Sequence, residues 1–174
     1  MSQVVVLVTF YSRSGATETR ALSLAVGAVQ ERALIRLRRL PDRDAALVLA
    51  HSPDHAGALE RMWKEYVPPT ETDVRGADAV VVAPTSRCDP ASAEWSSYFE
   101  VLRSLGAAGA LTGKVGAVVR NRDGASVQRF EQALQATGLS IVAPGAPPAD
   151  AATPEAATAH GRRVVTTARR RNQD

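Results

Sequence analysis

The stretch "VVVLVTFYSRSGATET", residues 4–19, decides the fold class of this chain. Its first five residues are all apolar, as in a strand that is covered on both faces. A polar turn follows, with three hydroxyl groups and a glycine: Ser12, Ser14, Gly15 and Thr17. Apolar residues then recur at helical spacing and predict a helix with one face on the sheet: Leu22, Ala25, Val26 and Val29. A strand, a short turn and a helix form the opening unit of a parallel α/β sheet.

The same unit repeats along the chain. Further apolar runs predict strands over 34–40, 79–83, 115–119 and 139–142, after the first at 4–10. Helical patterns fill the gaps, around 98–105, 127–134 and 154–168, and a short helix is expected over 57–66. The second strand, "LIRLRRL", contains three arginines and so predicts an edge. These features favour a three-layer α/β sandwich with a five-stranded parallel sheet of order 2-1-3-4-5, whose ligands bind at the carboxyl ends of the strands.

Size and composition narrow the function classes. With 174 residues, of which 45% are hydrophobic, residues 1–174 are expected to form a single domain. One cysteine, Cys88, suits a reducing cytoplasm, and no apolar run approaches the length of a membrane span. The net charge is only +3, and the arginines near the C-terminus lack interleaved aromatic residues. We therefore expect a cytoplasmic protein that binds neither nucleic acid nor membrane.

The turn after the first strand is suited to an anion. A helix N-terminus presents unpaired backbone N–H groups and the positive end of the helix dipole. Ser12, Ser14 and Thr17 add hydroxyl donors, while Gly15 lets the backbone approach closely. The turn lacks the lysine of nucleoside-triphosphate loops and the three glycines of dinucleotide-binding turns, so a terminal phosphate fits best. The alternative is that Ser12 or Ser14 only caps the helix.

Three segments carry a family resemblance. "VLVTFYSRSGATET", "ADAVVVAPTSRCDPASAEWSSYFEVL" and "LTGKVGAVV" resemble, in order and spacing, the flavodoxin-fold NAD(P)H:quinone oxidoreductases of the tryptophan-repressor-binding-protein-like family. The resemblance implies FMN as cofactor, NAD(P)H as co-substrate and a quinone or similar small-molecule acceptor. It also implies cofactor-binding residues in three loops: Ser12, Arg13, Ser14, Gly15, Ala16 and Thr17; Pro84, Thr85, Ser86 and Arg87; and Arg120, Asn121, Arg122, Asp123 and Gly124.

The chain departs from the family pattern in two of these loops and after strand five. "PTSRCDP" supplies no aromatic ring for the flavin, and "RNRDG" replaces a glycine-rich third loop. The family's long insertion, which helps to build its oligomer, is reduced to about "APPADAA", so the family's tetramer is not assumed for this chain and a homodimer is the oligomer considered. Two other interpretations therefore remain: a flavodoxin-like binding or regulatory domain without flavin or with another phosphorylated ligand, and a one-electron carrier, which the basic charge disfavours.

Few other side chains suggest chemistry. No catalytic residue is expected from the protein itself, since in a flavoenzyme the cofactor carries the electrons. Arg120 or Arg122 could raise the flavin potential if either approached the ring; alternatively both face solvent and Arg122 pairs with Asp123. His51 and His55 lack a third ligand, so no metal site is expected. Aromatic residues, namely Trp63, Trp95, Tyr98 and Phe99, are expected to serve in packing.

Overall fold

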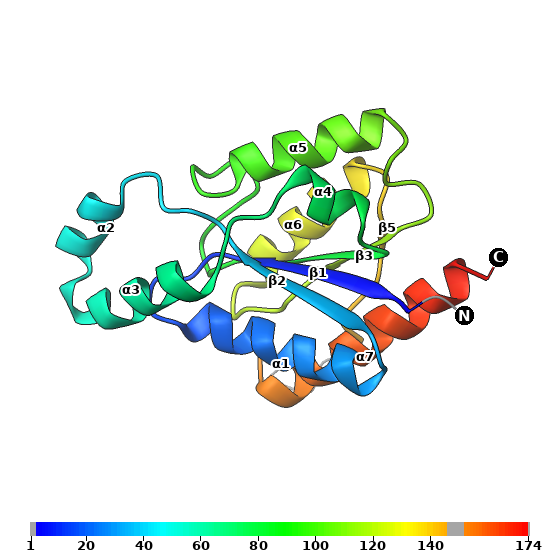
Figure 1. Cartoon of the computed structure of the whole chain (residues 1–174), viewed down its shortest axis with the longest axis horizontal. Helices are drawn as coiled ribbons and strands as arrows, with labels where there is room; N and C mark the ends of the chain where they lie inside the picture. The colour runs from blue at the N-terminus through cyan, green and yellow to red at the C-terminus, as the bar shows by residue number, and fades with distance from the viewer. Residues whose placement is uncertain (1–2, 146–151, 174) are drawn as a thin grey trace.

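A computed structural model describes residues 3–145 and 152–173 of the chain. Five parallel strands form one sheet in the order β2-β1-β3-β4-β5, with helices on both faces (Figure 1). The strands are β1 (Val5–Phe10), β2 (Leu34–Arg39), β3 (Ala79–Ala83), β4 (Val115–Val118) and β5 (Ser140–Ile141). The predicted α/β class and strand order are therefore confirmed. Most of the short segment "APPADAA" lies outside the described residues.

The helices form two layers and an addition at one end (Figure 1). One face of the sheet carries α1 (Ala16–Gln30) and α7 (Pro154–Arg171). The other carries α4 (Glu71–Arg75), α5 (Ser96–Ala107) and α6 (Gly124–Ala136). Beyond the carboxyl ends of β1 and β2 lie α2 (Ala45–His51), the 3-10 turn η1 (Pro53–His55) and α3 (Ala56–Glu65), beside the start of α1. The sequence predicted α3 but neither α2 nor α4.

Burial separates the central strands from the edge. All residues of β3 and nearly all of β1 are buried, because helices cover both of their faces. In β2, by contrast, most residues are only partly buried. Arg38 makes a bidentate ion pair with Asp73, at 2.9 Å for both bonds, and Arg36 approaches the same carboxylate at 3.9 Å. The prediction of an edge strand is confirmed, and two of its three arginines pair with Asp73 of α4.

Aromatic rings fill the core under α5 and α6. Trp95, fully buried, lies 5.0 Å from Phe130 and 6.2 Å from both Tyr98 and Phe99, measured between ring centroids. The packing role predicted for these residues is confirmed. Trp63 differs, because it is only partly buried and its indole Nε1 donates a hydrogen bond.

The predicted inner face of α1 is wrong. Leu22, Val26 and Val29 are 42%, 52% and 57% exposed, and of the predicted stripe only Ala25 is buried. The buried face consists of smaller residues and one leucine: Ala21, Leu24, Ala25, Gly27 and Ala28. The reason is the close approach of α7, since a methyl group at Gly27 would overlap the carbonyl oxygen of Thr158. Helix α1 therefore turns its small residues inward and leaves the bulky ones in solvent.

Candidate functional site

The turn between β1 and α1 is held by its own hydroxyl groups. Ser12 Oγ accepts a hydrogen bond from the Gly15 N–H at 3.0 Å, and Ser14 Oγ accepts one from the Ala16 N–H at 3.4 Å. Gly15 has a φ of 90°, in the left-handed region that favours glycine. The turn brings all six predicted residues, 12–17, to the carboxyl end of β1.

The three hydroxyl groups of the turn accept hydrogen bonds but do not donate any within the described residues. Thr17 Oγ1 accepts one from Arg20 Nη2 at 3.2 Å, as the serines do from the backbone. A hydroxyl can donate one bond while it accepts others. Ser12 and Thr17 are 1% and 3% exposed, so their unused O–H groups are shielded from bulk water. Within the described residues, none of these three hydroxyl groups therefore has an acceptor for its own proton, and Ser14 is exposed to solvent.

Helix capping accounts for only part of these side chains. The N-cap of α1 is Gly15, which has no side chain, and Ser14 Oγ takes only the N–H of Ala16, the first residue of the helix. The first-turn backbone N–H groups of Thr17 and Glu18 also find no acceptor among the residues that the structure describes. Such N–H groups at the positive end of a helix dipole, together with hydroxyl donors, are the donor set that a phosphate requires.

A cavity of about 470 Å³ opens beside this turn. Seven predicted cofactor residues line it: Ser12, Arg13, Ser14, Thr17, Thr85, Ser86 and Arg87. The first and second loops therefore meet at one site, as the sequence predicted. The volume lies in the range of small-molecule sites, about 300–1,000 Å³. No aromatic side chain of the second loop lines this cavity, in keeping with "PTSRCDP".

The third loop is bound to the second loop but does not line this cavity. Four of its predicted residues line a second cavity of about 910 Å³: Arg120, Asn121, Arg122 and Gly124. Gly15, Ala16, Pro84 and Asp123 line neither cavity. Among the described residues no ion pair joins Arg122 to Asp123. The role of these arginines near a flavin stays a prediction.

Two side chains of the third loop fasten it to the second. Asn121 Nδ2 donates to the carbonyl oxygens of Pro84 and Thr85, at 3.3 and 3.2 Å. Asp123 caps α6 by accepting from the Ser126 N–H, and it accepts from the Arg87 N–H as well. Their polar groups are thus engaged in holding the loops together.

A buried carboxylate that the sequence did not single out joins the first turn to residues 41–76. Asp42 accepts hydrogen bonds from Tyr11 Oη at 2.8 Å, Trp63 Nε1 at 2.7 Å and Arg39 Nη2 at 2.8 Å. Arg39 also donates to the Ser12 carbonyl oxygen at 2.8 Å. Burial alone would raise the pKa of Asp42, but these three donors hold it below its usual value. Burial raises the pKa of Tyr11 to about 12.

Residues outside the predicted loops complete the first cavity. Ser52 and His55 line it from the segment after β2, and Glu94 lines it from the residues before α5. Arg13 lies between them, with its Nε donating to Tyr11 Oη at 2.9 Å and an Nη2 at 3.8 Å from Glu94. The irregular composition of residues 41–76 gave no signal for such a role.

Cys88 lies on the cavity wall, where its Sγ accepts a hydrogen bond from Thr85 Oγ1 at 3.3 Å. Its Sγ donates to the Thr85 carbonyl oxygen at 3.0 Å, and burial raises its pKa.

Within the described part of the chain, no group of three or more His, Cys, Asp or Glu side chains could hold a metal ion. None of the helices described is long and apolar enough to cross a membrane.

Comparison with solved structures places this architecture. The protein aligns with the flavodoxin, WrbA-like protein from Agrobacterium tumefaciens over 97% of this chain and 99% of that one, with a TM-score of 0.64 and 18% identity. For the Streptococcus pneumonia TIGR4 flavodoxin the coverage is 94% and 99%, the TM-score 0.60 and the identity 17%. The chain has the flavodoxin-like fold. At these identities the likeness concerns the fold alone.

Sequence comparison agrees with the resemblance drawn from the motifs. The chain is 33% identical over 112 residues to an NAD(P)H dehydrogenase (quinone) of Rhodopseudomonas palustris, and 29% identical over 114 residues to one of Azorhizobium caulinodans. In both cases the match covers 64% of this chain and 53% of the relative, so it spans about half the length of these relatives. No protein-family model matches the chain.

Proposed function

We propose that this flavodoxin-like protein binds FMN and acts as an oxidoreductase between NAD(P)H and a quinone or similar acceptor. The observation that carries the cofactor is the set of three hydroxyl groups in the first turn that accept hydrogen bonds without donating any within the described residues. Unpaired N–H groups at the start of α1 add to this set. The flavodoxin-like fold and the NAD(P)H dehydrogenase (quinone) relatives support FMN over other phosphates.

In this proposal the chain's residues bind and orient. Ser12, Ser14 and Thr17 would donate to the phosphate oxygens, and the loop at 84–87 would lie beside the rest of the cofactor. Bound FMN would supply the hydride and electron chemistry, which the protein side chains cannot perform. Asn121 keeps the second and third loops in register through its bonds to residues 84 and 85. The part of the proposal that concerns NAD(P)H and the acceptor rests only on the NAD(P)H dehydrogenase (quinone) relatives.

The decisive experiment measures dissociation constants of FMN and riboflavin by quenching of flavin fluorescence. Riboflavin lacks the phosphate, so the wild type should bind FMN at least tenfold more tightly. Each hydrogen bond to a charged group contributes about 1.5–3 kcal/mol, so Thr17→Val should weaken FMN binding by about tenfold or more. Its effect on riboflavin should be much smaller.

Thr19→Val is the matched control. Thr19 lies two residues after Thr17 on the same helix. Its hydroxyl already donates a hydrogen bond to the Gly15 carbonyl oxygen. Its replacement should leave FMN affinity within about threefold of the wild type. A wild type that binds FMN would then be tested for NAD(P)H-dependent quinone reduction.

A binding domain for another phosphorylated ligand is the second candidate. The altered loops favour it, since "PTSRCDP" supplies no aromatic ring for a flavin and residues 120–124 do not line the first cavity. Binding of neither flavin by the purified protein would refute the oxidoreductase and leave this candidate.

A further inference from the structure

The first turn of α1 carries a buried negative charge. Glu18 is 4% exposed, and a methyl group built on Gly15 would lie 3.5 Å from its Oε2. The carboxylate is therefore close to the backbone that we propose to hold a phosphate. Two anions this close repel each other, more strongly in a poorly hydrated site than in water. A bare Glu18 would oppose the binding of any phosphate at this turn.

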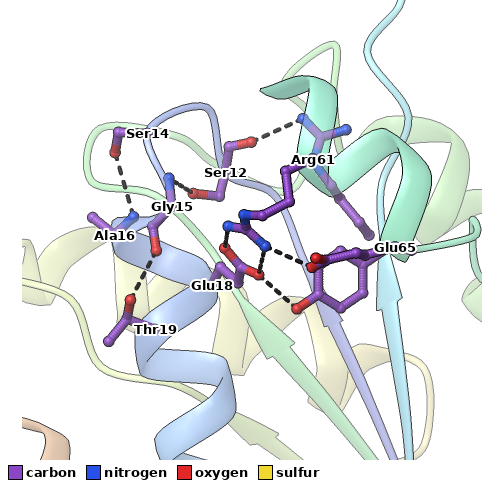
Figure 2. A network of polar contacts seen from close by, with 10 residues as sticks. Ser12, Ser14, Gly15, Ala16, Glu18, Thr19, Arg61 and Glu65 are labelled. Atoms are coloured by element: carbon purple, nitrogen blue, oxygen red, sulfur yellow. Dashed lines mark hydrogen bonds and ion pairs between the residues drawn. The ribbon is translucent and has the colours of Figure 1, made fainter. Parts of the chain in front are cut away.

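A cation from a distant part of the chain meets this carboxylate. Arg61 on α3 donates from Nη1 to Glu18 Oε1 at 2.9 Å and from Nη2 to Oε2 at 2.6 Å (Figure 2). Tyr66 Oη donates to Oε1 at 2.6 Å. The two hydrogen bonds from Arg61 hold the pKa of Glu18 below its usual value, so it stays ionised at neutral pH. Its charge is therefore neutralised by Arg61 rather than removed by protonation.

The guanidinium of Arg61 reaches the turn itself. Its Nη2 would lie 4.0 Å from a methyl group on Gly15, about as close as the carboxylate. Its Nη1 also donates to Glu65 Oε2 at 2.6 Å, and both of these side chains are about half exposed, at 44% and 50%. Figure 2 shows the contacts from Glu65 through Arg61 to Glu18, which lies beside the turn. Arg61 is thus about half exposed, and its ion pair with Glu18 connects α3 to the start of α1.

We propose that Arg61 is a positioning residue for the phosphate: it neutralises Glu18, so that the first turn accepts a phosphate dianion. Affinity for a phosphorylated ligand then depends on α3, a helix outside the three predicted loops. This inference rests on the proposed function, because it requires an anion at the turn. It differs from a purely mechanical role for the ion pair, in which Arg61 would only fasten α3 to α1.

The test compares FMN with riboflavin in four proteins. Arg61→Gln leaves Glu18 uncompensated, so FMN affinity should fall by about tenfold to a hundredfold. Riboflavin affinity should change by less than about threefold, because that ligand has no charge to be repelled. Glu18→Gln in the Arg61→Gln background removes both charges and should restore FMN affinity to within about threefold of the wild type. Arg61→Lys, which keeps the positive charge, should retain most of the wild-type affinity for FMN.

Two further measurements separate electrostatics from folding. Glu65→Gln removes an exposed partner of Arg61 but not Glu18, and it should not weaken FMN binding. Circular dichroism and urea unfolding of each variant would establish that it is folded.

The outcomes are distinguishable. If Arg61→Gln weakens both flavins equally, or if the double variant remains as weak as the single one, the ion pair is only mechanical and the inference is refuted. Unchanged FMN affinity in Arg61→Gln refutes it as well. A wild type that binds no FMN refutes the proposed function first, and the inference with it.

Discussion

Replacement of Asp42 by asparagine should destabilise the protein strongly. The Asp42 side chain is 1% exposed, and Arg39 beside it is 3% exposed. Asparagine keeps the shape but loses the charge, and it offers one oxygen instead of two to the three donors of Tyr11, Trp63 and Arg39. Breaking a buried ion pair on one side costs about 3–5 kcal/mol, because the other charge stays buried without a partner. We expect a loss in this range in the free energy of unfolding.

Urea unfolding at pH 7, followed by circular dichroism, measures this loss. A chain of this size shifts its Tm by about 2–4 °C per kcal/mol, so the melting temperature should fall by about 6–20 °C. Asp54→Asn is the matched control, since Asp54 is exposed in the same segment and makes no side-chain hydrogen bond or ion pair within the described residues. A loss below 1 kcal/mol in Asp42→Asn would refute the argument that this carboxylate holds residues 41–76 to the first turn.

The stability that Asp42 contributes should also depend on pH, in a direction that its pKa shift fixes. The pKa of Asp42 is lowered in the folded protein, so the unfolded chain takes up a proton first as the pH falls. The stabilisation from Asp42 is therefore fully present above the unfolded value, about 3.9, and is lost as the pH falls through the folded pKa. The stability difference between wild type and Asp42→Asn should accordingly shrink in acid. A difference that grows below pH 4 would contradict this assignment.

Three further predictions concern residues away from this carboxylate. Val26→Lys should change the free energy of unfolding, measured in urea, by less than about 0.5 kcal/mol, because Val26 is exposed. Leu24→Ala on the buried face should lower it by about 2–5 kcal/mol. A larger loss in Val26→Lys than in Leu24→Ala would contradict the orientation of α1. Burial lowers the pKa of His160 to about 4, so the wild type should lose about 2–3 kcal/mol between pH 7 and pH 4, and His160→Gln should lose less over the same range. Burial raises the pKa of Cys88, so Ellman's reagent should react with it more slowly at pH 7.5 than with free cysteine. A faster reaction would contradict a raised pKa.

The strand order could be predicted because it depends on local composition. Continuous apolar runs identify central strands, and the arginines of β2 identify an edge. Neither signal depends on how the helices pack. The orientation of α1 could not be predicted in this way, because the helix has two apolar faces. The choice between them depends on the distance to α7, where Gly161 approaches the Leu24 carbonyl oxygen too closely for any side chain. Such a distance is a property of the packed pair and is not encoded in either helix alone.

The candidate site divides along the same line. The first turn could be predicted, since its donors follow one another in sequence and the helix fixes their direction. The segment 41–76 could not be, because its contributions come from side chains far from the turn in sequence: Asp42, Arg61 and Trp63. In the third loop, Asn121 and Asp123 also hold the neighbouring second loop, a role that their polarity did not predict. A polar residue at the end of a strand therefore indicates a ligand only if its donors remain unused, as the hydroxyl groups of Ser12, Ser14 and Thr17 do within the described residues. By that criterion the first turn, together with the helix that neutralises Glu18, is the part of this protein where a ligand should be sought.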